Sequence, residues 1–137
     1  MAAHPSVPDD VLAQLRLVCL DLPDAVEEPA WVGTRWCVRK KNFAHVLTIN
    51  AGWPPAYAQA AACPGPACVL TFRCLRAQAD ATRFTQRPFF RPAWFPNIVG
   101  LMIDDGTDWD EVGALVAQSY CVLAPKRLAG LVDRVGR

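Results

Sequence analysis

The hydrophobic pattern of the chain changes its period twice, and this constrains the fold more than any other feature. Near the start, apolar residues recur at the spacing of one helix face, and the proline and acids of Pro8-Asp9-Asp10 suit the first turn of that helix. From Val26 the period shortens to two, which is typical of strands, and after Asp108 helical spacing returns. The first helical stripe consists of Val11, Leu15, Val18 and Leu22.

The alternating region predicts an antiparallel sheet of about five strands. Pro29 places the first strand at an edge, and the apolar residues on both faces of the fourth place it at the centre. A tight turn is expected at Lys40-Lys41-Asn42. In the third strand, alternation puts Phe43 on the same face as His45. The five strands are expected at Glu27–Gly33, Arg35–Lys40, Phe43–Ile49, Ala67–Leu75 and Ile98–Ile103.

The remaining segments predict helices and packed connections. Asp108 and Glu111 have the spacing of a capping box at the start of the clearest helix in the chain. Helices gathered at the two ends of a run of strands are typical of an α+β domain with two layers. The other segments are a short helix at Pro55–Ala62, a weak helix at Arg76–Phe84, a packed aromatic connection at Phe89–Pro96 and a last helix at Pro125–Val135.

Length and composition predict one folded domain spanning residues 1–137. The chain is 53% hydrophobic and 20% charged, which excludes a disordered protein. No apolar run approaches the roughly 18 residues of a membrane span. Residues 1–5 lack the basic region and apolar core of a signal peptide. We therefore expect a cytoplasmic monomer with no membrane association.

Charge is strongly segregated although the net charge is only +1. Residues 1–30 carry a net charge of −5, residues 31–92 of +8 and residues 93–137 of −2. Two interpretations remain open: a local positive surface on the strand-rich middle, or arginines on the solvated side of the sheet that cover apolar neighbours.

Six cysteines offer no recognisable metal site. None of their spacings is Cys-x-x-Cys, and only two histidines, His4 and His45, could add nitrogen ligands. Four of the six lie in segments that read as strands or helices, where buried free thiols are the ordinary finding. We expect reduced cysteines, no metal and no cofactor.

Several segments together resemble the MmcQ/YjbR family over about residues 9–135. The segments are Cys19-Leu20-Asp21-Leu22-Pro23, the run from Thr34 to Ala44, Pro88–Trp94, Ile98-Val99-Gly100, Asp104–Val112, Ser119-Tyr120 and Ala124–Leu128. The stretch Asn50–Ala67 departs from the family pattern. The resemblance implies a CyaY-like (frataxin-like) two-layer sandwich, and this family is described as carrying a double-wing DNA-binding motif.

Nucleic-acid binding by a basic sheet face and a hairpin wing is therefore the leading functional hypothesis. Strand parity places Arg35 and Arg39 on one side, and the two lysines would reach phosphates from a hairpin tip. If about five cations met phosphates, binding would weaken with salt at a logarithmic slope of roughly −4 to −5. An exposed Trp31 could stack on a base. The candidate residues are Arg35, Arg39, Lys40, Lys41, Arg73 and Arg76.

A protein- or small-ligand-binding module is the alternative. Aromatic residues in the C-terminal half could line a groove, or they could pack the helices against the sheet. The residues of this aromatic surface are Trp53, Phe90, Trp94 and Phe95, with Phe89 and Trp109 nearby. The acids around Asp104 and Asp108 read as a turn and a helix cap. The frataxin resemblance also raises iron at Asp9, Asp10 and Asp21, which as spread surface acids read as a solvated helix face.

Catalysis is not expected. The chain has two serines, Ser6 and Ser119, and Ser119 falls on the buried stripe of its helix. His45 lies among apolar strand residues. No nucleophile and base can be paired from spacing, and no glycine-rich phosphate loop is present.

Overall fold

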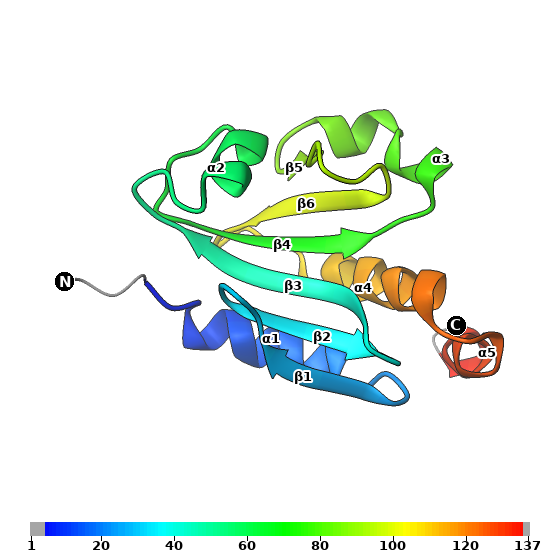
Figure 1. The fold of residues 1–137 in the computed structure, drawn as a ribbon. Helices are drawn as coiled ribbons and strands as arrows, with labels where there is room; N and C mark the ends of the chain where they lie inside the picture. Colours follow the sequence, from blue (N-terminus) through cyan, green and yellow to red (C-terminus); the bar gives the residue numbers. More distant parts are fainter. Residues whose placement is uncertain (1–4, 136–137) are drawn as a thin grey trace.

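A computed structural model of the protein describes residues 5–135, and its centre is an antiparallel sheet of six strands (Figure 1). The strands follow the spatial order β1-β2-β3-β4-β6-β5, so β1 is an edge strand and β4 is central, as predicted. The sixth strand comes from the expected aromatic connection. The strands are β1 (Ala25–Pro29), β2 (Thr34–Val38), β3 (Lys41–Ile49), β4 (Ala67–Arg73), β5 (Phe89–Phe90) and β6 (Ile98–Ile103).

Helices α1 (Asp9–Cys19) and α4 (Trp109–Leu123) pack side by side on one face of the sheet (Figure 1). This arrangement confirms the α+β class and the predicted two layers. α5 (Lys126–Val135) follows α4 at the end of the sheet where β2 ends and β3 begins. The predicted helix at residues 76–84 is divided into α3 (Arg76–Ala79) and a 3-10 turn at Thr82–Thr85.

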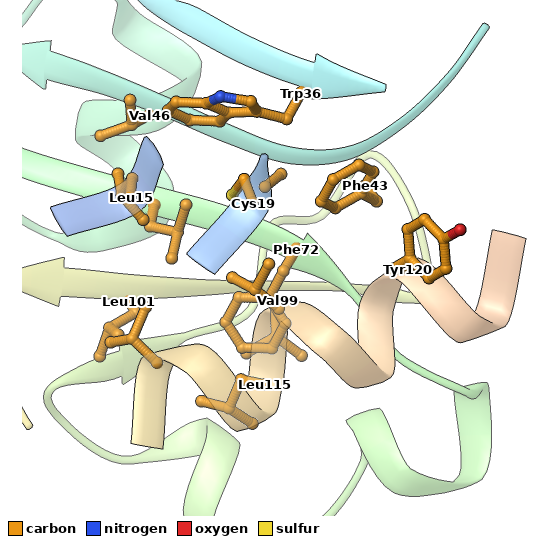
Figure 2. Packing of buried hydrophobic residues seen from close by; sticks show 14 of the residues in the cluster. Leu15, Cys19, Trp36, Phe43, Val46, Phe72, Val99, Leu101, Leu115 and Tyr120 are labelled. Carbon is orange, nitrogen blue, oxygen red and sulfur yellow. The ribbon is translucent and has the colours of Figure 1, made fainter. Parts of the chain in front are cut away.

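The main hydrophobic core lies between the sheet and the two long helices (Figure 2). Trp36, Phe43 and Tyr120 are its largest fully buried side chains. Trp36 also donates a hydrogen bond from Nε1 to Glu27 Oε1 over 3.0 Å. Both oxygens of the Glu27 carboxylate accept from Arg16 on α1, so this one side chain joins the first helix to the first two strands.

A smaller apolar cluster covers part of the opposite face, beneath α2 (Pro55–Ala61). Pro55 and the alanines of this segment favour a helix, which was predicted at nearly these residues. Arg87 donates to the carbonyl oxygens of Ala61 and Ala62 over 3.2 Å and thereby caps the C-terminal end of the helix. The residues under α2 include Leu47, Ile49, Val69 and Phe90.

A β-bulge at Phe43 overturns the predicted parity of β3. Trp36 pairs with Ala44 whereas Cys37 pairs with Asn42, which leaves Phe43 as the extra residue. The bulge turns Phe43 toward the helices, where its ring meets Tyr120 edge-on at 5.5 Å between centroids. His45 stays on the opposite face, so alternation placed these two residues together wrongly.

Two further local predictions need correction. The turn between β2 and β3 consists of Arg39 and Lys40, both with positive φ, rather than of Lys40-Lys41-Asn42. Arg39 therefore lies in the turn and does not share a strand face with Arg35. At the start of α4 the Asp108 side chain accepts from two backbone N–H groups, but the carboxylate of Glu111 pairs with Arg83 at 2.9 Å, so the capping box is half formed.

None of the helices within residues 5–135 combines the length and the hydrophobicity that crossing a membrane requires. His4 and the rest of residues 1–4, used above in the expectations on metal binding and targeting, lie outside the described part of the chain.

Candidate functional site

The β2–β3 hairpin ends in three consecutive exposed cations, Arg39, Lys40 and Lys41. Arg39 and Lys40 have φ of 50° and 68°, the pattern of a type I′ turn, where Asn-Gly is strongly preferred. Residues with a Cβ pay roughly 1–2 kcal/mol each for this conformation. The turn therefore carries charge at positions where local stability favours small residues.

Carboxylates neutralise only part of the predicted basic set. Arg35 pairs with Glu28 at 2.7 Å and Arg39 pairs with Asp24 at 3.2 Å; the first pair is partly buried and the second is exposed. Exposed ion pairs contribute only about 0–1 kcal/mol, so an incoming phosphate can replace such a carboxylate at little cost. Among the side chains that the structure describes, those of residues 5–132, no carboxylate lies within ion-pair distance of Lys40 or Lys41.

The start of α5 adds two exposed cations to the same end of the molecule (Figure 1). Burial raises the pKa of Tyr120, and both Arg39 and Arg127 are close enough to lower it in part. These two guanidinium groups therefore both lie near the Tyr120 hydroxyl. Lys126 and Arg127 were not among the predicted site residues, because only the packing of α4 against β3 brings them near the hairpin.

The other two predicted cations lie where β4 ends. Arg76 is exposed at the first position of α3. Arg73 is half-buried on the face of the sheet opposite α1 and α4, and burial lowers its pKa. Its guanidinium donates to Asn97 Oδ1 over 3.1 Å and lies 5.0 Å above the ring of Phe95. Arg73 is thus fixed in place, whereas the hairpin cations extend into solvent.

A pocket of about 250 Å³ opens beside Arg73 on this face. Its walls come from β3, β4, α2 and the connection between β5 and β6, so no single sequence segment indicates it. We refer to it as the open-face pocket. It is lined by Asn42, Phe43, His45, Tyr57, Thr71, Phe72, Arg73, Trp94, Phe95 and Ile98.

His45 holds the floor of the open-face pocket in a fixed arrangement. Its Nε2 lies 2.6 Å from the carbonyl oxygen of Val32, and a carbonyl can only accept, so Nε2 carries the proton. Nδ1 then accepts from the hydroxyl of Tyr57 at 3.3 Å. Burial lowers the pKa of His45, which keeps the ring neutral near pH 7.

The predicted aromatic surface is not one groove. Phe90 is buried against Gly100, where a Cβ would lie 2.2 Å from the Phe90 ring, and Phe89 is buried in the main core. Trp53 contacts the exposed Trp31, with ring centroids 5.4 Å apart, in a separate cavity. Trp94 and Phe95 reach the open-face pocket, where the ring centroids of Trp94 and Tyr57 are 5.0 Å apart. Trp109 packs partly buried against the main core.

Cysteines and acids form no further cluster in the described residues. No group of three or more His, Cys, Asp or Glu side chains is placed to hold a metal ion in the part of the chain whose side chains the structure describes, residues 5–132. All six cysteines are free thiols, and burial raises the pKa of Cys68 to about 12. Asp104 and Asp108 accept hydrogen bonds from backbone N–H groups of their own turns.

Ser119 has a structural role that the sequence pattern did not reveal. Its hydroxyl donates to the carbonyl oxygen of Phe43 over 2.5 Å and accepts from the backbone N–H of Arg73 over 2.7 Å. It therefore joins α4 to the bulge of β3 and to the end of β4. The adjacent Tyr120 hydroxyl donates to the carbonyl oxygen of Pro23 over 2.6 Å.

Comparisons with known proteins agree with the observed architecture. A family model described as YjbR matches residues 20–122. A crystal structure of a protein from Pseudomonas syringae, a structural-genomics target, is similar with a TM-score of 0.54 and 10% sequence identity over 82% of this chain and 96% of that one. At this identity the likeness concerns the fold alone. No curated protein matches the sequence.

Proposed function

The chain belongs to the YjbR family, and on this premise we propose that it binds nucleic acid without catalysing a reaction. The proposed surface is the end of the sheet where the β2–β3 hairpin and the start of α5 present their cations. The observation that carries the proposal is the exposed run Arg39-Lys40-Lys41, in a turn that local stability disfavours.

The chemistry of these side chains suits a phosphate backbone. Lysine and arginine on a projecting hairpin can reach phosphates that a flat sheet face cannot, and each neutralised phosphate releases counterions. Arg127 and Lys126 extend the positive surface beyond the hairpin, while Asp24 opposes it. Such contacts supply affinity and position the partner, and they read no sequence by themselves.

Salt-dependent binding tests the proposal directly. Labelled duplex and single-stranded DNA of equal length are titrated at low and at physiological salt. If five cations meet duplex phosphates, the logarithmic salt slope is about −4 to −5. The double variant Lys40→Gln, Lys41→Gln should weaken binding and reduce that slope by about 2.

A matched variant separates local contacts from net charge. Ala13→Glu with Gln14→Glu also changes the charge by two negative units, but at exposed positions in the second turn of α1 rather than on the hairpin. It should bind nearly as the unmodified protein does. Absence of binding at low salt, or equal weakening by both double variants, overturns the proposal.

A further inference from the structure

The open-face pocket lies next to the proposed phosphate-binding cations but is not explained by them. Asn42 lines the pocket and directly follows the two hairpin lysines, while Arg73 lines it from the end of β4. A strand bound along the hairpin would therefore pass its mouth. The question is which part of such a strand the pocket could take.

The aromatic wall suits a flat ring. Trp94 and Phe95 are 41% and 50% exposed, although large aromatic side chains are usually buried. Tyr57 stands at 64° to Trp94, so the two rings form a corner rather than a closed stack. An unpaired base can stack on such a surface regardless of its sequence.

Arg73 supplies a site for an anion at the rim of the same wall. Within residues 5–132, whose side chains the structure describes, no carboxylate forms an ion pair with it, and the acceptor of its side-chain hydrogen bond is the neutral Asn97 amide oxygen. A guanidinium has five N–H donors, so several remain for a ligand. Its packing over Phe95 fixes the plane of the group and so lowers the entropic cost of binding a phosphate.

Polar groups line the remaining side of the pocket. The Asn42 amide can donate and accept, and the Tyr57 hydroxyl retains its acceptor lone pairs because its proton points to His45. Thr71 adds a hydroxyl whose bond to the carbonyl oxygen of His45, at 3.5 Å, is long. These groups could meet the edge of a base, which carries both donors and acceptors.

We infer that the open-face pocket takes one nucleotide, with its base against Trp94 and its phosphate against Arg73. The inference rests on the proposed function and names its partner more closely: a single strand, whose unpaired bases can turn into the pocket. A duplex keeps its bases stacked and reaches only the surrounding cations. The same chemistry would also accept a free nucleotide.

Trp94→Ala tests the inference, with Leu17→Ala as the control because Leu17 is an exposed apolar side chain on α1 that does not line the pocket. Thermal unfolding first verifies that both variants fold. Each is titrated with labelled single-stranded DNA, with duplex DNA of equal length, and with thymidine and adenosine monophosphates by calorimetry. Trp94→Ala should weaken single-strand binding about 5- to 150-fold and leave duplex binding unchanged, and Leu17→Ala should change neither.

A second variant addresses the phosphate. Arg73→Gln removes the charge and keeps an amide, and it should abolish binding of the monophosphates while binding to the duplex persists. Monophosphate binding that depends on Trp94 and Arg73, without binding of either DNA, assigns the pocket to free nucleotides and overturns the function proposed above. Equal single-strand affinity of Trp94→Ala and the unmodified protein overturns the pocket and leaves that function intact.

Discussion

The two faces of the sheet are built from alternate residues of the same strands, yet one face forms the main core and the other carries the pocket. The face under α1 and α4 is mostly apolar, and its polar side chains are hydrogen-bonded: Ser119 of α4 makes two hydrogen bonds there, and Glu27 of β1 accepts from Arg16 and Trp36. The opposite face is apolar only where α2 covers it. Beyond α2 it carries His45, Arg73 and the open-face pocket.

This difference means that residues important for stability and residues available for binding lie on different faces of the sheet. Apolar side chains removed from water stabilise a fold in proportion to the area that they bury. Half-buried polar and charged groups gain little from folding, and Arg73 even has its pKa lowered by burial. The polar side chains of the pocket can therefore be replaced with little loss of stability, whereas the apolar side chains under the helices cannot.

The largest expected difference between the faces lies in two neighbouring residues of β4. Phe72 is 3% exposed in the main core and Thr71 is 8% exposed at the pocket. Phe72→Ala should lower the free energy of unfolding by about 3–5 kcal/mol. Thr71→Val should lower it by about 1 kcal/mol or less, because it replaces a long hydrogen bond with a side chain of equal shape. Urea unfolding measures both, and equal losses would contradict the distinction between the faces.

A smaller loss is expected at the joint between α4 and the sheet. Ser119→Ala leaves the N–H of Arg73 and the carbonyl oxygen of Phe43 without their buried partner, at a cost of about 2–4 kcal/mol. Tyr120→Phe removes one bond to the partly exposed Pro23 and should cost about 1 kcal/mol. Chemical denaturation of the two variants compares them directly. The interpretation of Ser119 as a joint fails if its variant is the more stable of the two.

The smallest expected effect is a pH dependence of stability that arises from His45, on the face of the sheet opposite α1 and α4. Burial lowers the pKa of His45 below its ordinary value of 6.5, so the folded protein binds fewer protons there than the unfolded chain does. Stability should therefore fall as the pH drops below about 6.5, by up to about 1.4 kcal/mol per pH unit until the folded pKa is passed. His45→Gln should remove this part of the slope in unfolding curves recorded from pH 7.5 to 5. Identical slopes would show that His45 is not desolvated.

Local pattern was sufficient for the elements that depend on their own residues. Strand β6 was predicted at Ile98–Ile103 and lies there, and Pro55 with the following alanines indicated α2. The helix cap at Asp108 was likewise visible, because its acceptor and donors are only two and three residues apart. Pairing between strands could not be predicted in the same way: no local pattern marks the bulge at Phe43, because the bulge depends on the register of β2 against β3.

The candidate site shows the same limit more sharply. Arg73, Trp94 and Phe95 were all singled out from sequence, but in two separate hypotheses, and the structure brings them into one pocket with His45 and Tyr57. No local signal joins residues so far apart along the chain. The order of helical and strand-like hydrophobic patterns along the sequence determined an antiparallel sheet with a helical layer. The distribution of charged residues determined a basic middle segment. Tertiary structure alone decided which charges meet carboxylates and which line a cavity, because those neighbours are set by strand register and helix packing rather than by spacing in the chain.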